Sequence, residues 1–417
     1  MSSSAARAAV DAVWRSESAR IVGALARYTG DFTLAEDLAQ EAVAEALVAW
    51  SVNGLPAEPV GWLLTAGQRR AIDMFRRRAA QEEKYALLAS GLSGEEPGVD
   101  ALFNPEAIDD DVLTLMFIAC HPVLSREARV ALTLRVVGGM GTEEIARAFL
   151  VPVPTIQARI TRAKKTLAAA HIPFVAPELP DIPERLGSVL QVVYLIFSEG
   201  AFASGGDSWM RTELASEARR LARVLARLAP EPEVFGLLAL MELTAARFPA
   251  RLDPAGNPVL LEDQDRRRWD QSAVRRGRAA LKTAVGAGRG LGAYGLQASI
   301  AECHAMARSA AETDWQRIVI LYEALGQLTP SPVVELNRAV AVAMASGPSA
   351  GLAMVDSLAD SGVLNGSHLL PTVRGELLTR LGRVREAKGA LLEALRLCSN
   401  AAERTALERK ISELPGQ

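Results

Sequence analysis

Apolar and polar residues recur with helical spacing along most of the chain, and residues 142–167 show the pattern in its shortest form. Ile145, Ala146 and Phe149 give the first half one apolar side. The step Val151-Pro152 then breaks the pattern, because the residue before a proline avoids the α conformation. The second half resumes with apolar positions at Ile156, Ile160, Ala163 and Leu167. The segment therefore predicts two short helices around a tight turn.

The second of these helices is predicted to be basic on the faces that its apolar residues leave free. Its polar residues are Gln157, Arg159, Arg162, Lys164 and Lys165. A helix-turn-helix makes base and phosphate contacts with a helix of this kind, which packs by one face and presents amide and cationic side chains on another. A helical hairpin with a solvated charged face is the alternative interpretation of the same pattern.

Two longer helices are predicted upstream, in residues 33–50 and 60–81. In the first, Asp37, Glu41 and Glu45 form an acidic stripe at i, i+4 and i+8. The turn-rich residues 51–59 follow it. The second helix begins apolar and ends basic, with Arg69, Arg70, Arg76, Arg77 and Arg78. Two helices held together by surface charge would explain either one alone, so the pattern leaves their function open.

The C-terminal half shows helical hairpins of the tetratricopeptide type. Residues 314–348 predict two helices with Pro330 and Pro332 at the turn, and residues 369–397 predict two more. The interface of the second hairpin is predicted to be filled by Leu377, Leu378, Leu381, Leu391, Leu392 and Leu395. Such stacks usually present a concave surface to a protein partner.

Two stretches without periodicity divide the chain. Residues 86–108 mix glycine, proline and acidic residues, and residues 172–183 carry four prolines. The pieces between them are residues 1–85, 109–171 and 184–417. We predict an all-α protein with two small helical domains, the second a helix-turn-helix, and a longer α-helical extension.

Composition limits which classes of partner the protein can bind and which cellular compartment is expected. The net charge of −3 excludes a generally basic nucleic-acid coat, so any DNA contact must come from local patches. Three scattered cysteines are too few for a disulfide framework. The sequence shows no N-terminal apolar signal core and no stretch of membrane-spanning length. These features predict a soluble cytoplasmic protein that does not enter a membrane.

The sequence offers only weak motifs for metal binding, nucleotide binding and catalysis. The adjacent pairs Cys120-His121 and Cys303-His304 lie in different predicted pieces and do not supply convergent ligands for a structural metal. The glycine-rich residues 286–295 follow no strand pattern, so they predict a loop rather than a nucleotide-binding turn. Paired carboxylates on helix faces give no reason to infer acid–base catalysis. We therefore expect no metal, no cofactor and no enzyme activity.

The ordered segments resemble an extracytoplasmic-function (ECF) RNA polymerase sigma factor of the sigma-70 family. "GDFTLAEDLAQEAVAEALVAW" is similar to the polymerase-binding helix of sigma region two, and "PVGWLLTAGQRRAIDMFRRR" is similar to the −10 helix that follows it. "GTEEIARAFLVPVPTIQARITRAKKTL" is similar to region four. The segments "YLIFSEG", "DWQRIVILYEAL" and "LGRVREAKGALLEAL" resemble the subgroup with a tetratricopeptide-like C-terminal extension. Ser198 and Ala201 replace the asparagine and final tyrosine usual in the first of these, which puts a polar role for that motif in doubt.

The resemblance implies partners and residue roles. Bacterial core RNA polymerase would bind Asp37, Glu41 and Glu45. The −10 element of promoter DNA would bind Asn53, Arg69, Arg70, Arg76 and Arg77. The −35 element would bind Thr155, Gln157, Arg159, Arg162, Lys164 and Lys165, with the two lysines holding the DNA backbone.

The function implied is an initiation factor that directs core polymerase to promoters, supports promoter melting and is regulated by its own extension. That extension is also expected to bind a protein partner. One alternative is a conventional helix-turn-helix regulator with a tetratricopeptide-like partner- or ligand-binding domain, which leaves the acidic helix and the −10-like helix unexplained. The other is an interaction scaffold that uses the N-terminal region only as a tether.

Overall fold

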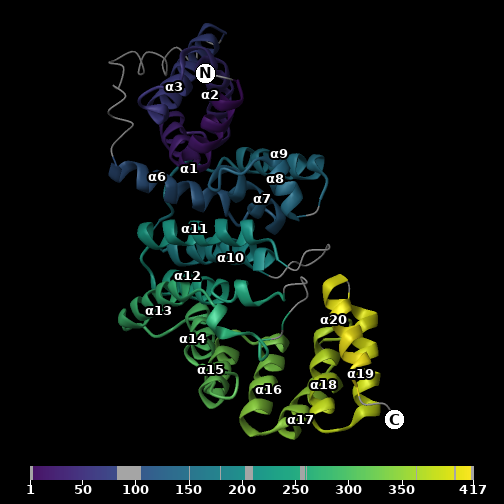
Figure 1. Ribbon diagram of the computed structural model, residues 1–417. Coiled ribbons are helices and arrows are strands. Elements are labelled where there is room, and N and C mark those ends of the chain that lie inside the picture. The colour runs from purple at the N-terminus through teal and green to yellow at the C-terminus, as the bar shows by residue number, and fades with distance from the viewer. Residues whose placement is uncertain are drawn as a thin grey trace. The chain divides into compact units, whose positions relative to one another are not determined.

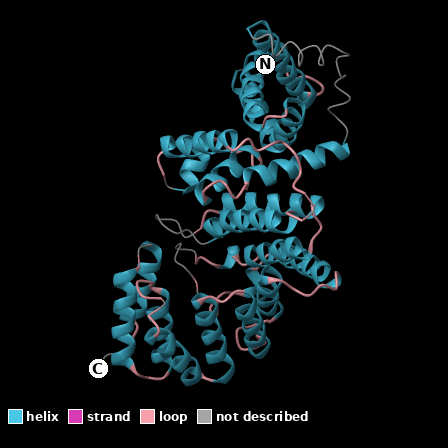
Figure 2. Cartoon of the chain, turned by 180° about the vertical axis from the view of Figure 1, so that it is seen from behind, coloured by secondary structure: helices cyan, strands magenta, loops and turns pink. Residues whose placement is uncertain are grey.

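The computed structural model of the chain describes residues 3–81, 105–149, 151–178, 180–201, 210–253, 259, 261–362, 364–398 and 401–414. Figure 2 shows helices joined by loops, and no strand occurs within these ranges. The predicted all-α fold is therefore confirmed. The chain separates into two compact units, Met1–Ile196 and Phe197–Gln417, which are described separately.

The first three helices form a bundle at the N-terminus (Figure 1). They are α1 (Ser3–Thr29), α2 (Phe32–Asn53) and α3 (Pro59–Gln81), and each packs against the other two. Ile21, Leu25 and Leu63 are fully buried between them. Trp50 is buried as well, and its ring meets that of Trp62 edge-on at 5.7 Å. The acidic and basic helices predicted at 33–50 and 60–81 are thus α2 and α3, and α1 completes their core.

The remaining helices of the first unit carry the predicted helix-turn-helix. They are α6 (Pro105–Ala119), α7 (Arg126–Val136), α8 (Thr142–Phe149) and α9 (Val153–Ala169). Helices α7, α8 and α9 pack on one another. The break falls at Val151-Pro152, and Pro154 lies in the first turn of α9. Two short helices around a tight turn are therefore confirmed. Of the predicted linker 86–108, residues 86–104 lie outside the described residues.

Helix α10 (Ile182–Ala201) begins inside the predicted linker 172–183 and spans the division between the two units. Arg185 donates from Nη2 to the carbonyl of Phe117 at 2.7 Å. Ser188 donates to the carbonyl of Cys120 at 2.7 Å and accepts from Arg129 at 2.9 Å. These bonds tie the first part of α10 to α6 and α7, and this part of the helix belongs to the first unit.

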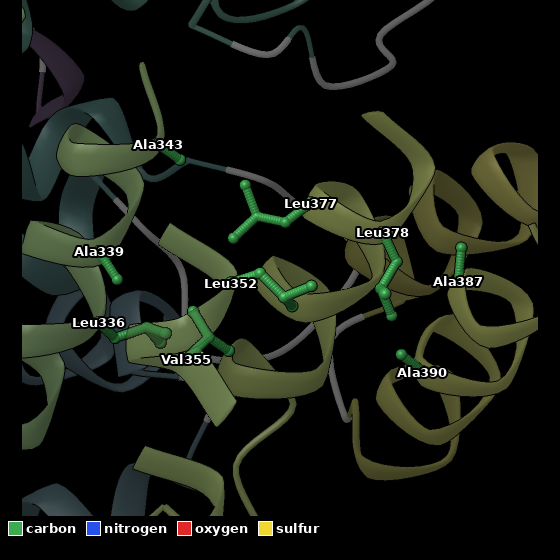
Figure 3. Close-up of a cluster of buried hydrophobic side chains, with 9 residues drawn as sticks. All are labelled: Leu336, Ala339, Ala343, Leu352, Val355, Leu377, Leu378, Ala387 and Ala390. Carbon is green, nitrogen blue, oxygen red and sulfur yellow. The ribbon is translucent and has the colours of Figure 1, made fainter. Parts of the chain in front are cut away.

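The second unit is a run of helices in which each packs on its neighbours. They are α11 (Thr212–Leu228), α12 (Pro232–Ala245), α13 (Gln271–Gly286), α14 (Ala293–Met306), α15 (Trp315–Leu328), α16 (Pro332–Ser346), α17 (Pro348–Asp360), α18 (Leu369–Arg380), α19 (Val384–Leu397) and α20 (Ala401–Ser412), with short 3₁₀ turns at Phe248–Ala250 and Arg266–Arg268. Figure 3 shows the buried cluster that joins α16 to α19, built from alanines and from Leu336, Leu352, Val355, Leu377 and Leu378. Both predicted hairpins are present.

The α18–α19 hairpin packs closely because small residues line its interface. A Cβ atom added to Gly375 would lie 2.7 Å from Cγ of Leu391. Leu377, Leu378 and Leu391 are buried as predicted. The prediction for Leu392 is wrong, because its side chain is 48% exposed. It follows Leu391 by one residue, and this step of 100° around the helix turns its side chain toward solvent.

A buried carboxylate joins three helices of the second unit. Glu242 of α12 is 1% exposed and forms ion pairs with Arg219 at 2.6 Å, Arg223 at 2.6 Å and Arg276 at 3.1 Å. Burial alone would raise the pKa of Glu242, but hydrogen bonds and charge from the three arginines hold that pKa below its usual value. The carboxylate is therefore ionised and shared by α11, α12 and α13.

Candidate nucleic-acid interface

The acidic stripe predicted on α2 lies on an exposed face of the N-terminal bundle. Asp31 caps the helix by accepting from the backbone N–H groups of Thr33 and Leu34 at 2.7 and 3.1 Å. The exposed fractions of the stripe's side chains are 61% for Asp37, 57% for Glu41 and 30% for Glu45. The opposite face of α2 packs into the bundle through alanines, Leu38 and Trp50.

The same face of α2 continues with exposed valines that the sequence analysis did not single out. Val48 is 68% exposed and Val52 is 76% exposed. At 100° per residue, both lie within the arc covered by Asp37 and Glu45. The face is therefore acidic in its first half and apolar in its second. Helical spacing alone, applied to the polar side of α2, would have found this feature.

The predicted DNA-binding arginines of α3 contact the predicted polymerase-binding carboxylates of α2. Arg69 pairs with Glu45 at 2.7 Å, and Arg70 pairs with Glu41 at 2.8 Å and with Glu45 at 2.9 Å. The hydrogen bond to Glu45, supported by Glu41, raises the pKa of Arg70. The charge-paired helices considered from sequence are thus present. Because the pairs are exposed, they contribute little stability and can be exchanged for other partners.

The other predicted −10 residues lie at the ends of the two helices. The predicted loop 51–59 is shorter than expected, because α2 extends to Asn53 and Gly54 ends it with a φ of 84°. Asn53 is exposed on this last turn, and Arg76 is exposed near the end of α3. The side chain of Arg77 lies outside the described residues. The helix extension places Asn53 on a rigid element rather than in a loop.

Helix α9 divides into the two faces that the sequence predicts. Ile156, Ile160, Ala163 and Leu167 are buried, as expected. Gln157, Arg162 and Lys165 are exposed, whereas Thr155 and Arg159 are partly buried. The exposed amide and cations along this helix have the composition that reads base edges and holds phosphates in a major groove.

Lys164 differs from its neighbour Lys165. Its ammonium forms ion pairs with Glu36 and with Asp37, the latter at 2.8 Å, and its side chain is only 16% exposed. Burial would lower the pKa of Lys164, but the two carboxylates outweigh that effect and raise it. Glu36 itself is 3% exposed. Sequence reasoning missed Glu36, because it lies among the buried positions of α2 and periodicity does not reveal a distant partner.

The other candidate chemical sites are the cysteine–histidine pairs and the glycine-rich segment. Cys120, Cys303 and Cys398 are buried thiols, and burial raises the pKa of Cys120 to about 11. Burial and nearby arginines lower the pKa of His304 to about 4. Within the described ranges, no cluster of three or more histidine, cysteine or acidic residues could hold a metal ion. Gly288 and Gly290 have positive φ angles between α13 and α14, so the middle of the glycine-rich segment is a loop as predicted, whereas Gly286 ends α13 and residues 293–295 begin α14.

The second unit contains a cavity of about 240 Å³. Its lining includes Trp315, Met344, Val373 and Leu377 together with the charged Arg266 and Lys410. Such a mixture of apolar walls and a few charged groups is usual in ligand and peptide sites. None of the helices in the described ranges is both long enough and apolar enough to span a membrane.

Comparison with known families finds three matches along the chain. Residues 13–81 match the family described as Sigma-70 region 2, and residues 114–167 match Sigma-70, region 4. Residues 185–285 match DUF6596, a family of unknown function. The two sigma matches fall on the α1–α3 bundle and on α6–α9.

Relatives extend these matches. An uncharacterized protein of Rhizobium meliloti (strain 1021) is 41% identical over 413 residues, which cover 98% of this chain and 96% of that protein. The probable ECF RNA polymerase sigma factor SigI, from two strains of Mycobacterium tuberculosis, is 27% identical over 165 residues, which cover 39% of this chain and 56% of SigI. No solved structure matches the chain.

Proposed function

This chain belongs to the sigma-70 family of RNA polymerase sigma factors, and we propose that it binds core RNA polymerase through α2 and directs it to promoters through α3 and α9. A DUF6596 domain forms part of its C-terminal extension. The proposed site of action is the cytoplasm, where the polymerase partner works, and the proposed role requires no catalytic activity of the chain itself.

The observation that carries the proposal is the composite face of α2. Asp37, Glu41 and Glu45 offer carboxylates to a basic partner, and Val48 and Val52 offer exposed apolar surface on the same arc. Protein interfaces combine an apolar centre with polar groups around it, and complementary charge raises the rate of encounter.

The −10 role rests on exposed polar groups at the ends of α2 and α3. Asn53 and Arg76 are free to contact DNA in the described structure. Arg69 and Arg70 would exchange their carboxylate partners for phosphates when DNA arrives, because exposed ion pairs of this kind are weak. Arg77 is assigned with them by family likeness. Phosphate contacts here would hold an opened strand during promoter melting.

The −35 role rests on α9. Gln157 and Arg162 are exposed and would read base edges, with Thr155 and Arg159 beside them. Lys164 and Lys165 would hold the DNA backbone. Loss of a base-reading arginine should reduce discrimination by about 1–3 kcal/mol, whereas loss of a phosphate-binding lysine should weaken binding on all sequences.

The extension is proposed to regulate initiation through a partner. The support is its run of packed helical hairpins and the cavity of about 240 Å³ near α15, α16 and α18. Helical stacks of this type present surfaces suited to proteins or peptides. Deletion of the extension should therefore change the level of transcription without abolishing the binding of core polymerase.

Capture of core RNA polymerase by the immobilised full-length chain tests the proposal. The double variant Glu41→Lys/Glu45→Lys should lose capture, because it reverses the charge of the binding face. Arg69→Glu/Arg70→Glu is the matched control, since it breaks the same ion pairs and leaves the carboxylates in place; it should retain capture. Val48→Glu should weaken capture by about tenfold, because it adds charge to apolar interface surface.

Two results would count against the proposal. Capture that survives the Glu41→Lys/Glu45→Lys reversal would remove α2 as the binding face. Failure of the wild-type chain to capture polymerase, together with specific binding to duplex DNA, would favour the conventional helix-turn-helix regulator.

A further inference from the structure

The cavity of about 240 Å³ in the second unit has walls of two different kinds. Helices α15 and α16 supply an apolar wall, which is formed by Trp315, Val340, Ala343 and Met344. Helix α18 lines the cavity with polar side chains on successive turns, at Thr372, Glu376 and Arg380. In Figure 3, the side chain of Leu377 on the same helix points toward Ala343 of α16. A ligand held here would therefore meet both apolar surface and charged groups.

The charged residues of the lining do not balance one another. The lining carries three cations and two carboxylates, which are Arg266, Arg380, Lys410, Glu262 and Glu376. Each carboxylate already has a partner, because Glu376 forms an ion pair with Lys410 and Glu262 forms one with Arg380 at 2.6 Å. Arg266 is left without a carboxylate among the lining residues. The cavity therefore has an excess of one positive charge.

The hydrogen bonds of Arg266 all go to neutral acceptors in the described part of the chain. Its Nη1 donates to the carbonyl oxygens of His304 and Ala307 at 2.6 and 2.9 Å, and its Nη2 donates to the hydroxyl of Thr313 at 3.2 Å. Burial lowers the pKa of Arg266, and the charge of the exposed Glu312 offsets this effect only in part. These bonds fix the position of the guanidinium without neutralising its charge.

A second arginine beside Arg266 adds to the positive charge. Arg266 and Arg247 both lie over the ring of Trp269, with their Cζ atoms 5.2 and 5.6 Å from its centroid. Arg247 donates from Nε to Oε1 of Gln264 at 3.3 Å, which is again a neutral acceptor. Burial, together with the charges of Arg251 and Arg266, lowers the pKa of Arg247 to about 10. Arg247 is still charged at neutral pH, so an anion bound nearby would be stabilised.

Arg380 offers an N–H group that a ligand could use. Its Nη2 donates to Glu262, but its Nη1 donates to the thioether sulfur of Met344 at 3.0 Å. A thioether is a weak acceptor, whereas a carboxylate accepts a short, charge-assisted bond from a guanidinium. The side chain of Arg380 is 34% exposed, so a ligand can reach it. A carboxylate in the cavity would therefore replace a poor hydrogen bond with a strong one.

We propose that this cavity binds a small amphipathic monocarboxylate, whose apolar chain packs against Trp315 and Met344 and whose carboxylate accepts from Arg380. An apolar cavity of about 150 Å³ holds benzene, so this one has room for about ten carbon atoms. One negative charge would balance the lining, and a dianion would exceed it. The inference names the partner of the extension, and its regulatory meaning rests on the proposed function.

Isothermal titration calorimetry of the full-length chain with octanoate tests the site. A probe of this size should bind with a dissociation constant of about 1 mM or lower. Octan-1-ol, which has the same chain and no charge, should bind at least about tenfold more weakly. Along the series hexanoate, octanoate and decanoate, affinity should rise about threefold for each added CH₂ group until the cavity is full.

Three variants locate the binding and separate it from damage to the fold. Arg380→Gln should weaken octanoate binding by about tenfold, because it removes the proposed donor. Arg383→Gln is the matched control, since it removes an exposed arginine that pairs with Glu386 outside the cavity; it should leave affinity unchanged. Glu262→Gln should strengthen binding by about threefold, because it removes the carboxylate that competes for Arg380. Thermal unfolding of each variant checks that its fold is retained.

The outcomes separate this inference from the proposed function, because the titration contains no polymerase. Absence of binding by octanoate and decanoate would overturn the inference, and so would equal affinity for octanoate and octan-1-ol. Equal losses with Arg380→Gln and Arg383→Gln would overturn it too, since they would show general charge attraction. A chain that binds octanoate as predicted but does not capture core polymerase would lose the sigma function and keep this site. The reverse pair of results would remove the site and keep the function.

Discussion

Two buried carboxylates, Glu36 in α2 and Glu242 in α12, show how differently the two units of this protein use charge. Their exposed fractions are 3% and 1%. The partners of Glu242 come from α11 and α13, which are its neighbours in one helical stack. The partners of Glu36 are Lys164, 128 residues away, and Arg135, and both belong to a different sigma region.

The difference teaches that the surroundings of a buried ion pair decide its role. Around Glu242, the packing of α12 on α11, α13 and α14 holds the arginines in place, so the carboxylate cannot regain water without unfolding. Around Glu36, the cations arrive on helices of the other sigma region, where α6 also packs closely on α1, and separation of the two regions would return every group to water. The first arrangement is structural, and we infer that the second is releasable.

The largest effect is expected at Glu242. Glu242→Gln removes the charge that Arg219, Arg223 and Arg276 share and leaves three guanidinium groups facing a neutral amide. The free energy of unfolding of the second unit should fall by about 3–5 kcal/mol in denaturant titrations. Glu302→Gln, which breaks the more exposed pair with Arg278, is the control and should cost no more than about 1 kcal/mol.

Acid should remove the same contribution in the wild type. The pKa of Glu242 is lowered in the folded protein, so its stabilising effect is present above the unfolded value of 4.5 and is lost as the pH falls through the folded pKa. The stability difference between wild type and Glu242→Gln should therefore shrink as the pH decreases below about 4.5. A difference that stays constant down to pH 2 would show that the ionised carboxylate is not its source.

Removal of one cation from each site sharpens the comparison. Arg219→Ala should lower the free energy of unfolding by about 1.5–3 kcal/mol, because Glu242 stays enclosed with one partner fewer. Lys164→Ala should lower it by about 1 kcal/mol or less, because region four can separate and Glu36 can regain water. If Lys164→Ala destabilised the chain as strongly as Arg219→Ala, the contact between the sigma regions would be structural rather than releasable.

The smallest effect is expected for the exposed pairs between α2 and α3. Arg70→Ala removes two ion pairs, with Glu41 and Glu45, yet water already reaches all three groups. Arg70→Ala should lower the free energy of unfolding by at most about 1 kcal/mol, and added salt should abolish this difference. A larger effect that persists in salt would show that these pairs hold the bundle together and do not exchange readily with phosphates.

The buried face of α9 could be predicted from sequence, but the contact of Lys164 with Glu36 of α2 could not. Periodicity placed Ile156, Ile160 and Leu167 on one side, because helical spacing is a local property. The pairing of Lys164 with Glu36 depends on how two regions meet, which local spacing does not contain. Family likeness supplied roles for both helices without showing that they contact each other.

Other differences between the predicted and the observed elements have local physical reasons. Helix α1 was not predicted, because its alanine-rich sequence is buried over much of its length and shows little contrast between faces. Leu392 was placed in the α18–α19 interface because leucine is usually buried, whereas its position on the helix points it outward. The exposed Val48 and Val52 are the converse case, since apolar residues at outward positions mark a surface that a partner can cover.

The most direct test of the central claim is transcription of genomic DNA by core RNA polymerase reconstituted with the full-length chain. We predict transcripts that begin at a limited set of positions with shared −10 and −35 sequences, and that disappear with Glu41→Lys/Glu45→Lys. If core polymerase produced the same transcripts with and without the chain, the chain would not be acting as a sigma factor.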